Sequence, residues 1–294
     1  MRRIYLTLLM VALVAAVPNR ADAGFIIIDG TDANDHGSAS GGMNLGGWEY
    51  MQRVLENLAS SRLAANPGVT KTIYNVGANV GSQSGNAITS AFALSGLSGS
   101  GWTLINVNGA AAINTLLGSL NANTNGILAF STASNSGGDL DSTEVAAINA
   151  NAANIETYLG AGGALHAMAQ SGTGANGYLT TLLPGLVVTD VGGGGIFTTP
   201  TLTAAGFAAF PGLTNADIGG ATPWHNYFSG NLGGLSVLGT APDGSATRNL
   251  ILGGAGGTIV LPPNNAVPAP AGLVLGFIGM GFAGLTRRLW TKKA

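Results

Sequence analysis

The stretch that decides the fold is "FIIIDGTDANDHG" (residues 25–37), near the start of the chain. Its first four residues are apolar without a break, which is the pattern of a strand covered on both faces of a sheet. Asp29, Asp32, Asp35 and His36 follow closely. The stretch therefore predicts a buried strand that ends in a polar loop.

Similar short runs alternate with helical patterns along the chain. Apolar stripes at helical spacing cover residues 43–62 and 142–159, and Asp141 with Glu144 forms a capping box before the second. This alternation predicts an α/β fold with a doubly wound, mainly parallel sheet; an all-β fold is the alternative, because Gly, Ser, Asn and Thr are common. The predicted strands are 25–29, 71–77, 103–108, 126–131, 164–169, 186–191, 235–241 and 249–254, and weaker helices fit 84–94, 110–120 and 175–183.

Composition excludes several functional classes. The 294 residues include no cysteine, so a thiol enzyme or a disulfide-stapled module is excluded. Between residues 24 and 270, four basic residues stand against twelve acidic ones, a net charge of −8. Because such a body repels phosphate backbones, we expect no nucleic-acid partner.

The N-terminus has the pattern of a secretory signal peptide over residues 1–23. Arg2 and Arg3 precede an apolar run at 4–17, and "ADA" (21–23) is a small-x-small cleavage site. We expect the mature chain to begin at Gly24. An uncleaved membrane anchor is the alternative.

The C-terminus has the pattern of a short transmembrane helix with a basic tail, residues 271–294. A Pro-rich linker at 263–270 leads into it, and the apolar run 271–285 would span roughly 22 Å as a helix, against ~30 Å of hydrocarbon. Basic residues after the run place that end in the cytoplasm and the domain at 24–262 outside. A buried core helix is the alternative.

This tail resembles the PEP-CTERM sorting domain of exported proteins in Gram-negative bacteria. The resemblance rests on Val267, Pro268, Ala269 and Pro270, a glycine-rich apolar helix, and Arg287 with Arg288; Ala269 stands where the family usually has glutamate. It implies export through the secretion translocon, an inner-membrane-anchored precursor, and processing by an exosortase-like enzyme. The final location would be the envelope, the cell surface or the extracellular matrix, where polysaccharide is the implied partner.

The central domain resembles the class I glutamine-amidotransferase-like group, which includes trehalose-utilisation-like proteins. The segment "GAGGALHAMAQSG" (160–172) carries this resemblance. It implies a flavodoxin-like α/β fold. Catalytic members place a cysteine on the turn that follows the strand, where this chain has Met168 to Ser171. The resemblance therefore implies the fold and not the activity.

The opening polar loop is a candidate cation site. Ligands of parallel sheets collect beyond the carboxyl ends of the strands, where Asp29 would lie. Asp29, Asp32 and Asp35 offer the hard oxygen ligands that Ca²⁺ prefers, and no other cofactor is expected. The alternative is that these residues cap turns and keep the loop soluble.

A second candidate site is the aromatic stretch "TPWHNYFSGN" (222–231). If it forms a loop, its aromatic residues would stack on a sugar ring while the amides of Asn226 and Asn231 bind the hydroxyls; the aromatic residues are Trp224, His225, Tyr227 and Phe228. The alternative is a packed loop with a buried histidine.

No complete catalytic constellation is visible in the sequence. A hydrolase of glycans or esters would use Asp29, Asp35, His36 and His225 at the sheet edge, with Ser171 as a further candidate nucleophile. "AQSGT" lacks the glycines of a nucleophile elbow. The sequence therefore favours a non-catalytic binding or structural role in an extracellular matrix, with the extracytoplasmic hydrolase as the alternative.

Overall fold

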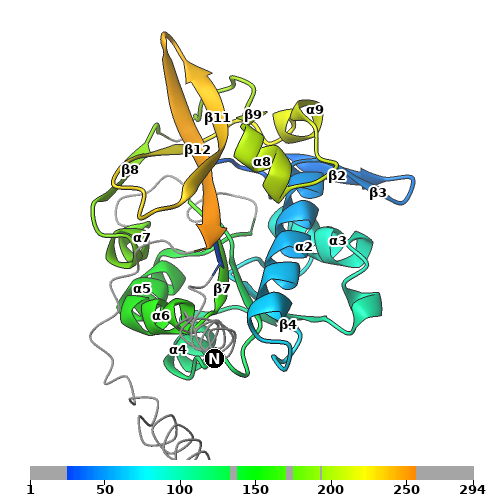
Figure 1. The fold of residues 1–294 in the computed structure, drawn as a ribbon, viewed down its shortest axis with the longest axis vertical. Helices are drawn as coiled ribbons and strands as arrows, with labels where there is room; N and C mark the ends of the chain where they lie inside the picture. Colours follow the sequence, from blue (N-terminus) through cyan, green and yellow to red (C-terminus); the bar gives the residue numbers. More distant parts are fainter. Residues whose placement is uncertain (1–24, 133–137, 170–174, 193, 256–294) are drawn as a thin grey trace, which may run out of the picture. The chain divides into compact units, whose positions relative to one another are not determined.

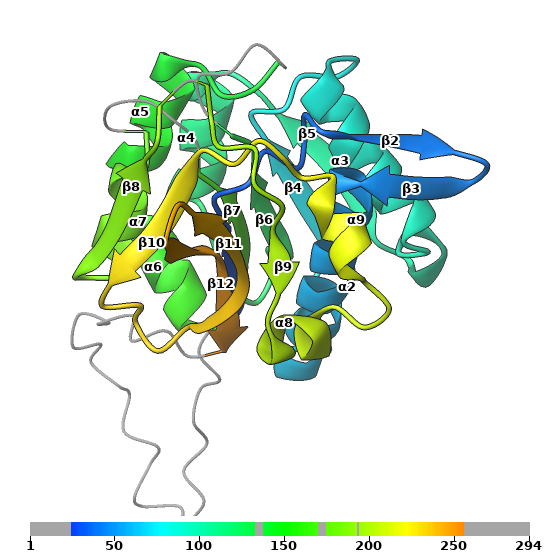
Figure 2. The same cartoon turned by 90° about the horizontal axis from the view of Figure 1, so that it is seen from above.

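The computed structural model describes residues 25–132, 138–169, 175–192 and 194–255. They form an α/β fold in which helices cover both faces of a mainly parallel sheet (Figures 1 and 2). The predicted fold class is confirmed at this level. Each of the eight predicted strands overlaps a strand of this sheet.

Five neighbouring strands of the sheet are parallel. In spatial order they are β5 (Thr103–Val107), β4 (Thr72–Val76), β6 (Ile127–Phe130), β7 (Ala164–Met168) and β1 (Phe25–Asp29). The sheet continues through antiparallel neighbours: β12 (Ala246–Ala255), β10 (Asn226–Gly230) and β8 (Leu186–Asp190). β11 (Ser236–Asp243) pairs with β12, and β9 (Thr201–Leu202) pairs with β11.

Two layers of helices enclose this sheet, as Figure 2 shows from above. One layer holds α2 (Gly47–Ala65), α3 (Gln83–Leu94), α8 (Ala204–Ala209) and α9 (Asn215–Gly219). The other holds α4 (Ala110–Gly118), α5 (Ser142–Ala150), α6 (Ala152–Gly160) and α7 (Gly177–Leu182), and a short 3₁₀ turn, η1 (Ser98–Ser100), precedes β5. Ile26 and Ile28 join one core cluster and Ile27 the other, which explains why β1 is apolar without alternation.

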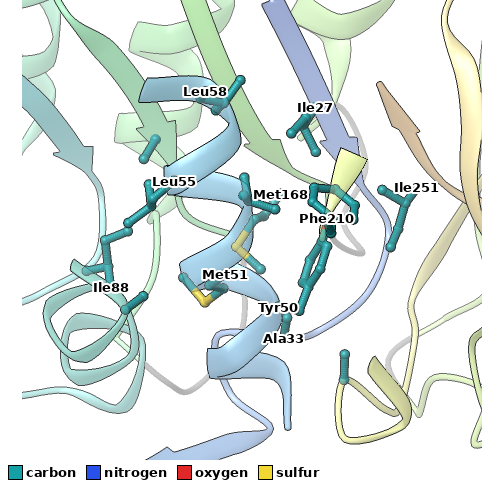
Figure 3. Close-up of a cluster of buried hydrophobic side chains, with 14 of the residues drawn as sticks. Ile27, Ala33, Tyr50, Met51, Leu55, Leu58, Ile88, Met168, Phe210 and Ile251 are labelled. Carbon is teal, nitrogen blue, oxygen red and sulfur yellow. The ribbon is translucent and has the colours of Figure 1, made fainter. Parts of the chain in front are cut away.

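The stripe on α2 anchors one of the two cores (Figure 3). Met51, Leu55 and Leu58 are buried in the cluster that also contains Ile27 and Met168. Burial of each such side chain stabilises the fold by roughly 1.5–3 kcal/mol. The predicted stripe is confirmed there.

The strand order differs from the flavodoxin-like order that the resemblance implied. In that order the first strand lies between the second and third parallel strands, whereas β1 lies beyond β7. The physical cause is the crossover after β1, because α2 contacts β1, β7 and β6 before the chain enters β4.

Three predicted segments have different bounds or types. Residues 43–46 are not helical: β3 (Met43–Gly46) pairs with β2 (Gly37–Ser40), and Gly46 has a φ of 60° that ends the strand before α2. The predicted helix 142–159 is two helices, because the Asn151 amide bonds the Ala147 carbonyl and Asn114 and interrupts the ladder.

The stretch 222–231 is not simply a loop, because residues 226–230 form β10. Phe228 belongs to one core cluster, while Tyr227 packs against the other. This alternation across the sheet is what a strand requires. The capping box of Asp141 and Glu144 at the start of α5 is present as predicted.

The predicted terminal segments lie outside the described residues. These are the signal peptide at 1–23, the linker and sorting motif at 263–270, and the apolar helix and basic tail at 271–294. Within the ranges that the structure describes, no helix combines the length and hydropathy that crossing a bilayer requires.

Candidate functional site

The parallel half of the sheet has a topological switch point between β4 and β6. From β4 the chain continues through α3 to β5, while from β6 it continues through α5 and α6 to β7 on the opposite side. Crossovers that diverge from neighbouring strands leave a crevice at the carboxyl ends, where ligands of open α/β sheets bind. The loops after β1, β4 and β6 meet at this position.

Asn34 joins these loops through its side-chain amide. Its Nδ2 lies 2.7 Å from Asp139 Oδ1 and 3.0 Å from both Ser84 Oγ and Thr132 Oγ1, so its two hydrogens are shared among these acceptors. Ser131 Oγ lies 3.4 Å from the same nitrogen and donates to Asp139 at 2.5 Å. Ser84 also donates to Asp35 at 3.1 Å. We call this set the edge network: Asn34, Asp35, Ser84, Ser131, Thr132 and Asp139.

The edge network is largely buried, and its burial changes the acidity of the Asp139 carboxyl group. Burial raises the pKa of Asp139, and hydrogen bonds from Ser131 and Ser84 oppose that rise. Within the described ranges of the chain, Asp139 Oδ2 is enclosed and has no hydrogen-bond partner. A carboxyl group with a raised pKa at a switch point is a feature of functional sites.

A second polar group lies in the loop after β1 and the segment before β10. Asp32 Oδ2 is 3.2 Å from His225 Nε2 and 3.3 Å from His36 Nε2. Asp32 and His225 are buried, whereas the His36 side chain is 41 % exposed. We call these three residues the histidine group.

His225 is positioned to carry a positive charge. Its Nδ1 lies 3.4 Å from the Gly192 carbonyl oxygen, so both ring nitrogens face oxygen acceptors. The hydrogen bond with Asp32 raises the pKa of His225, and burial opposes the rise. The histidine group therefore has the chemistry of a general acid–base site in which a carboxylate orients an imidazole.

Asp29 belongs to neither group. Its Oδ1 accepts from the Thr31 amide at 2.7 Å, and its Oδ2 lies 4.0 Å from His166 Nε2. Burial raises the pKa of Asp29 to about 7 and lowers that of His166 to about 3. Both residues are enclosed on the α2 side of the sheet, and we call them the buried pair.

The three aspartates of the predicted calcium site have separate contacts in the structure. Asp29 faces the core, Asp32 faces two imidazoles, and Asp35 accepts from Ser84. Among the residues described by the structure, no three His, Cys, Asp or Glu side chains are placed to hold a metal ion. The reason is geometric, because a turn over residues 33–35 sends successive carboxylates in different directions.

The aromatic stretch is packed rather than open. Trp224 and Asn226 are fully buried, and His225 is 5 % exposed. Tyr227 is half-buried, and the guanidinium of Arg248 lies 4.5 Å from its ring centre. Trp224 therefore has no free face for a sugar ring, and its surroundings match the packed alternative.

Of the predicted catalytic residues, His36 and His225 are brought together through Asp32, whereas Asp29 and Asp35 lie elsewhere. Ser171 lies outside the described residues. The sequence reasoning missed Asn34, Ser84 and Asp139. A usable signal existed for Ser131 and Thr132, which follow β6 directly, as ligand-binding residues of parallel sheets often follow their strands.

Comparisons with known proteins gave no match: no family model, curated protein or solved structure corresponds to this chain.

Proposed function

We propose that this chain is an exported envelope or surface protein that binds a neutral, hydroxyl-rich ligand, of carbohydrate type, at the edge network. Its role is binding or structural within an extracellular matrix. The observation that supports it is the chemistry of the network, which combines hydroxyls, an amide and carboxyl groups at the switch point.

The charge around the site favours neutral ligands. Residues 72–247 contain no lysine or arginine, so the loops after β4 and β6 provide no fixed cation. Asp35 and Asp139 lie in the network itself. A phosphate or uronate group would meet carboxylates without compensation, whereas a sugar hydroxyl can donate to Asp35, which is the partly exposed carboxylate of the network.

Binding is tested with purified exported protein and two sets of oligosaccharides, one neutral and one uronate-containing, by titration calorimetry. We expect binding to the neutral set and at least a tenfold loss for Asp35→Asn, because the variant loses the partly exposed carboxylate acceptor. Glu156→Gln on α6 is the matched control, since it removes one acidic side chain from the opposite end of the fold. The proposal would be wrong if the unsubstituted protein and the two variants bound with equal affinity, or if none of the neutral oligosaccharides bound.

Export and processing are the second part of this proposal. They rest on the signal-peptide pattern and on the resemblance of residues 266–294 to the PEP-CTERM tail. The secretion translocon and an exosortase-like enzyme are the implied partners. Mass spectrometry of surface material should find termini near Gly24 and near Pro270, and secreted chains that retain Ala294 would contradict processing.

Hydrolysis of a glycan or ester is the second candidate function. The histidine group supports it, because the exposed His36 imidazole is oriented by Asp32 at 3.3 Å, as a general base would be. The nucleophile would be water. Reducing-end or ester assays should show turnover that His36→Asn abolishes while ligand affinity is retained. Binding without turnover would leave the non-catalytic role.

A further inference from the structure

A small cavity lies directly beneath the edge network. It has about 10 Å³ of space, which is room for about one water molecule. Met51, Ile88 and Met168 form part of its apolar wall, on the α2 side of the sheet (Figure 3). Its polar lining is contributed by Asn34, Asn75, Ser84, Ser131 and His166. The cavity therefore separates the edge network from the apolar core.

In the part of the chain that the structure describes, two residues that line this cavity have a buried polar atom without a hydrogen-bond partner. These atoms are His166 Nε2 and Asn34 Oδ1, and each residue is 1 % exposed. A buried polar atom left unsatisfied costs about 1–3 kcal/mol. Buried polar groups are therefore nearly always bonded, either to protein atoms or to ordered water.

We propose that this cavity is a binding site for one ordered water molecule, held by Asn34 Oδ1 and His166 Nε2. A water molecule has two hydrogens to donate, and Asn34 Oδ1 accepts one of them. Neutral His166 Nε2 accepts the other or, in the second tautomer, donates to the water oxygen. The Ser84 and Ser131 hydroxyls also line the cavity, and because they donate their hydrogens to carboxylates they can act toward the water only as acceptors.

This water extends the edge network into the core. Asn34 belongs to the network, and His166 Nε2 lies 4.0 Å from Asp29 Oδ2. The water therefore completes a polar path from Asp35 and Ser84, through Asn34, to the buried pair. His166 is then a hydrated member of the site rather than an unsatisfied core residue.

Substitution of Ala129, which lines the cavity on β6, distinguishes a wet cavity from a dry one. Ala129→Val fills the space with methyl groups, and Ala129→Ser places a hydroxyl there. If water is bound, Ala129→Val displaces it and lowers the Tm, whereas Ala129→Ser replaces its hydrogen bonds and lowers the Tm less. In a dry cavity Ala129→Ser displaces nothing and its hydroxyl bonds the unsatisfied polar atoms, so it should raise the Tm. A Tm above that of the unsubstituted protein for Ala129→Ser would therefore overturn the proposal.

A crystal structure of the unsubstituted protein provides a test that does not depend on how the variants fold. We expect a density peak within about 3.2 Å of both His166 Nε2 and Asn34 Oδ1. Crystals grown with rubidium in place of sodium should show no anomalous signal there. An anomalous peak, an empty cavity, or a direct bond between His166 and Asn34 would each overturn the assignment of water.

Discussion

Asp32 and Asp29 both lie at the carboxyl end of β1, and each faces an imidazole, yet the two contacts differ in kind. Asp32 lies 3.2 Å from His225 and 3.3 Å from the half-exposed His36. Asp29 lies 4.0 Å from His166, and both are sealed in the core. The pKa of His225 is raised through its hydrogen bond to Asp32, whereas burial lowers that of His166 to about 3.

The difference shows whether hydrogen bonding or burial decides the charge state of an Asp–His pair. At the edge, a short hydrogen bond favours the imidazolium and the carboxylate together. In the core, the cost of burying two charges exceeds the attraction across 4.0 Å, so the proton stays on the carboxyl group. The same two residue types therefore favour the charged imidazole in one place and the neutral imidazole in the other.

The largest expected effect comes from breaking the buried pair. The raised pKa of Asp29 contributes stability that is present below pH 4 and lost as pH rises through 7. The lowered pKa of His166 contributes stability that is present above pH 6.5 and lost as pH falls through 3. Between pH 4 and 6.5 these trends oppose each other. His166→Gln should lose on the order of 4 kcal/mol of unfolding free energy as pH rises from 4 to 7 relative to the unsubstituted protein.

Asp29→Asn is the complementary variant and should show the opposite trend. With His166 alone, stability should rise by roughly 5 kcal/mol between pH 3 and 6.5, which is about 4 kcal/mol more than the unsubstituted protein gains. Urea unfolding at four pH values measures all three proteins. Parallel stability profiles would show that neither group is held neutral by the core.

An intermediate effect is expected from the histidine group. Asp32→Asn removes the carboxylate that both imidazoles share, so the pKa of His225 should fall, as measured by NMR titration. A raised His225 pKa contributes stability below pH 6.5 that is lost at higher pH, so the variant should be weakened most in acid. We expect a loss of about 1.5–3 kcal/mol at pH 5.5. A loss that grows with pH would contradict the ion pair.

The smallest effect is expected from His36→Ala. This imidazole is 41 % exposed, and exposed pairs contribute about 0.2–1 kcal/mol. Chemical unfolding at low and high salt should show a small difference that salt reduces. A loss as large as that of Asp32→Asn would mean that His36, and not His225, is the main partner of Asp32.

Much of the fold was predictable because local patterns report burial. The uninterrupted apolar run of β1 predicted a strand covered on both faces, and the stripe on α2 predicted its buried side. The capping box at Asp141 was visible for the same reason, since its partners are three residues apart. The break at Asn151 was not visible, because it depends on Asn114, which belongs to another helix.

The site was less predictable because its members are distant in sequence. Asp32 and His225 were both noticed, but nothing local indicates that they meet across 193 positions. Arg62 is a second example, because its local sequence identifies it only as one of the four basic residues between residues 24 and 270. In the structure it is fully buried and donates to the carbonyls of Ala122, Asn125 and Gly126.

The sequence alone determined the positions of the eight predicted strands and the buried stripe of α2, because hydrophobic periodicity acts within a few residues. It also determined the scarcity of cations in the body of the chain. Only the tertiary structure decided the strand order, the partner of each aspartate and the enclosure of Trp224. Those depend on which loops converge at the carboxyl ends of the strands, and that convergence is set by crossovers that no local pattern encodes.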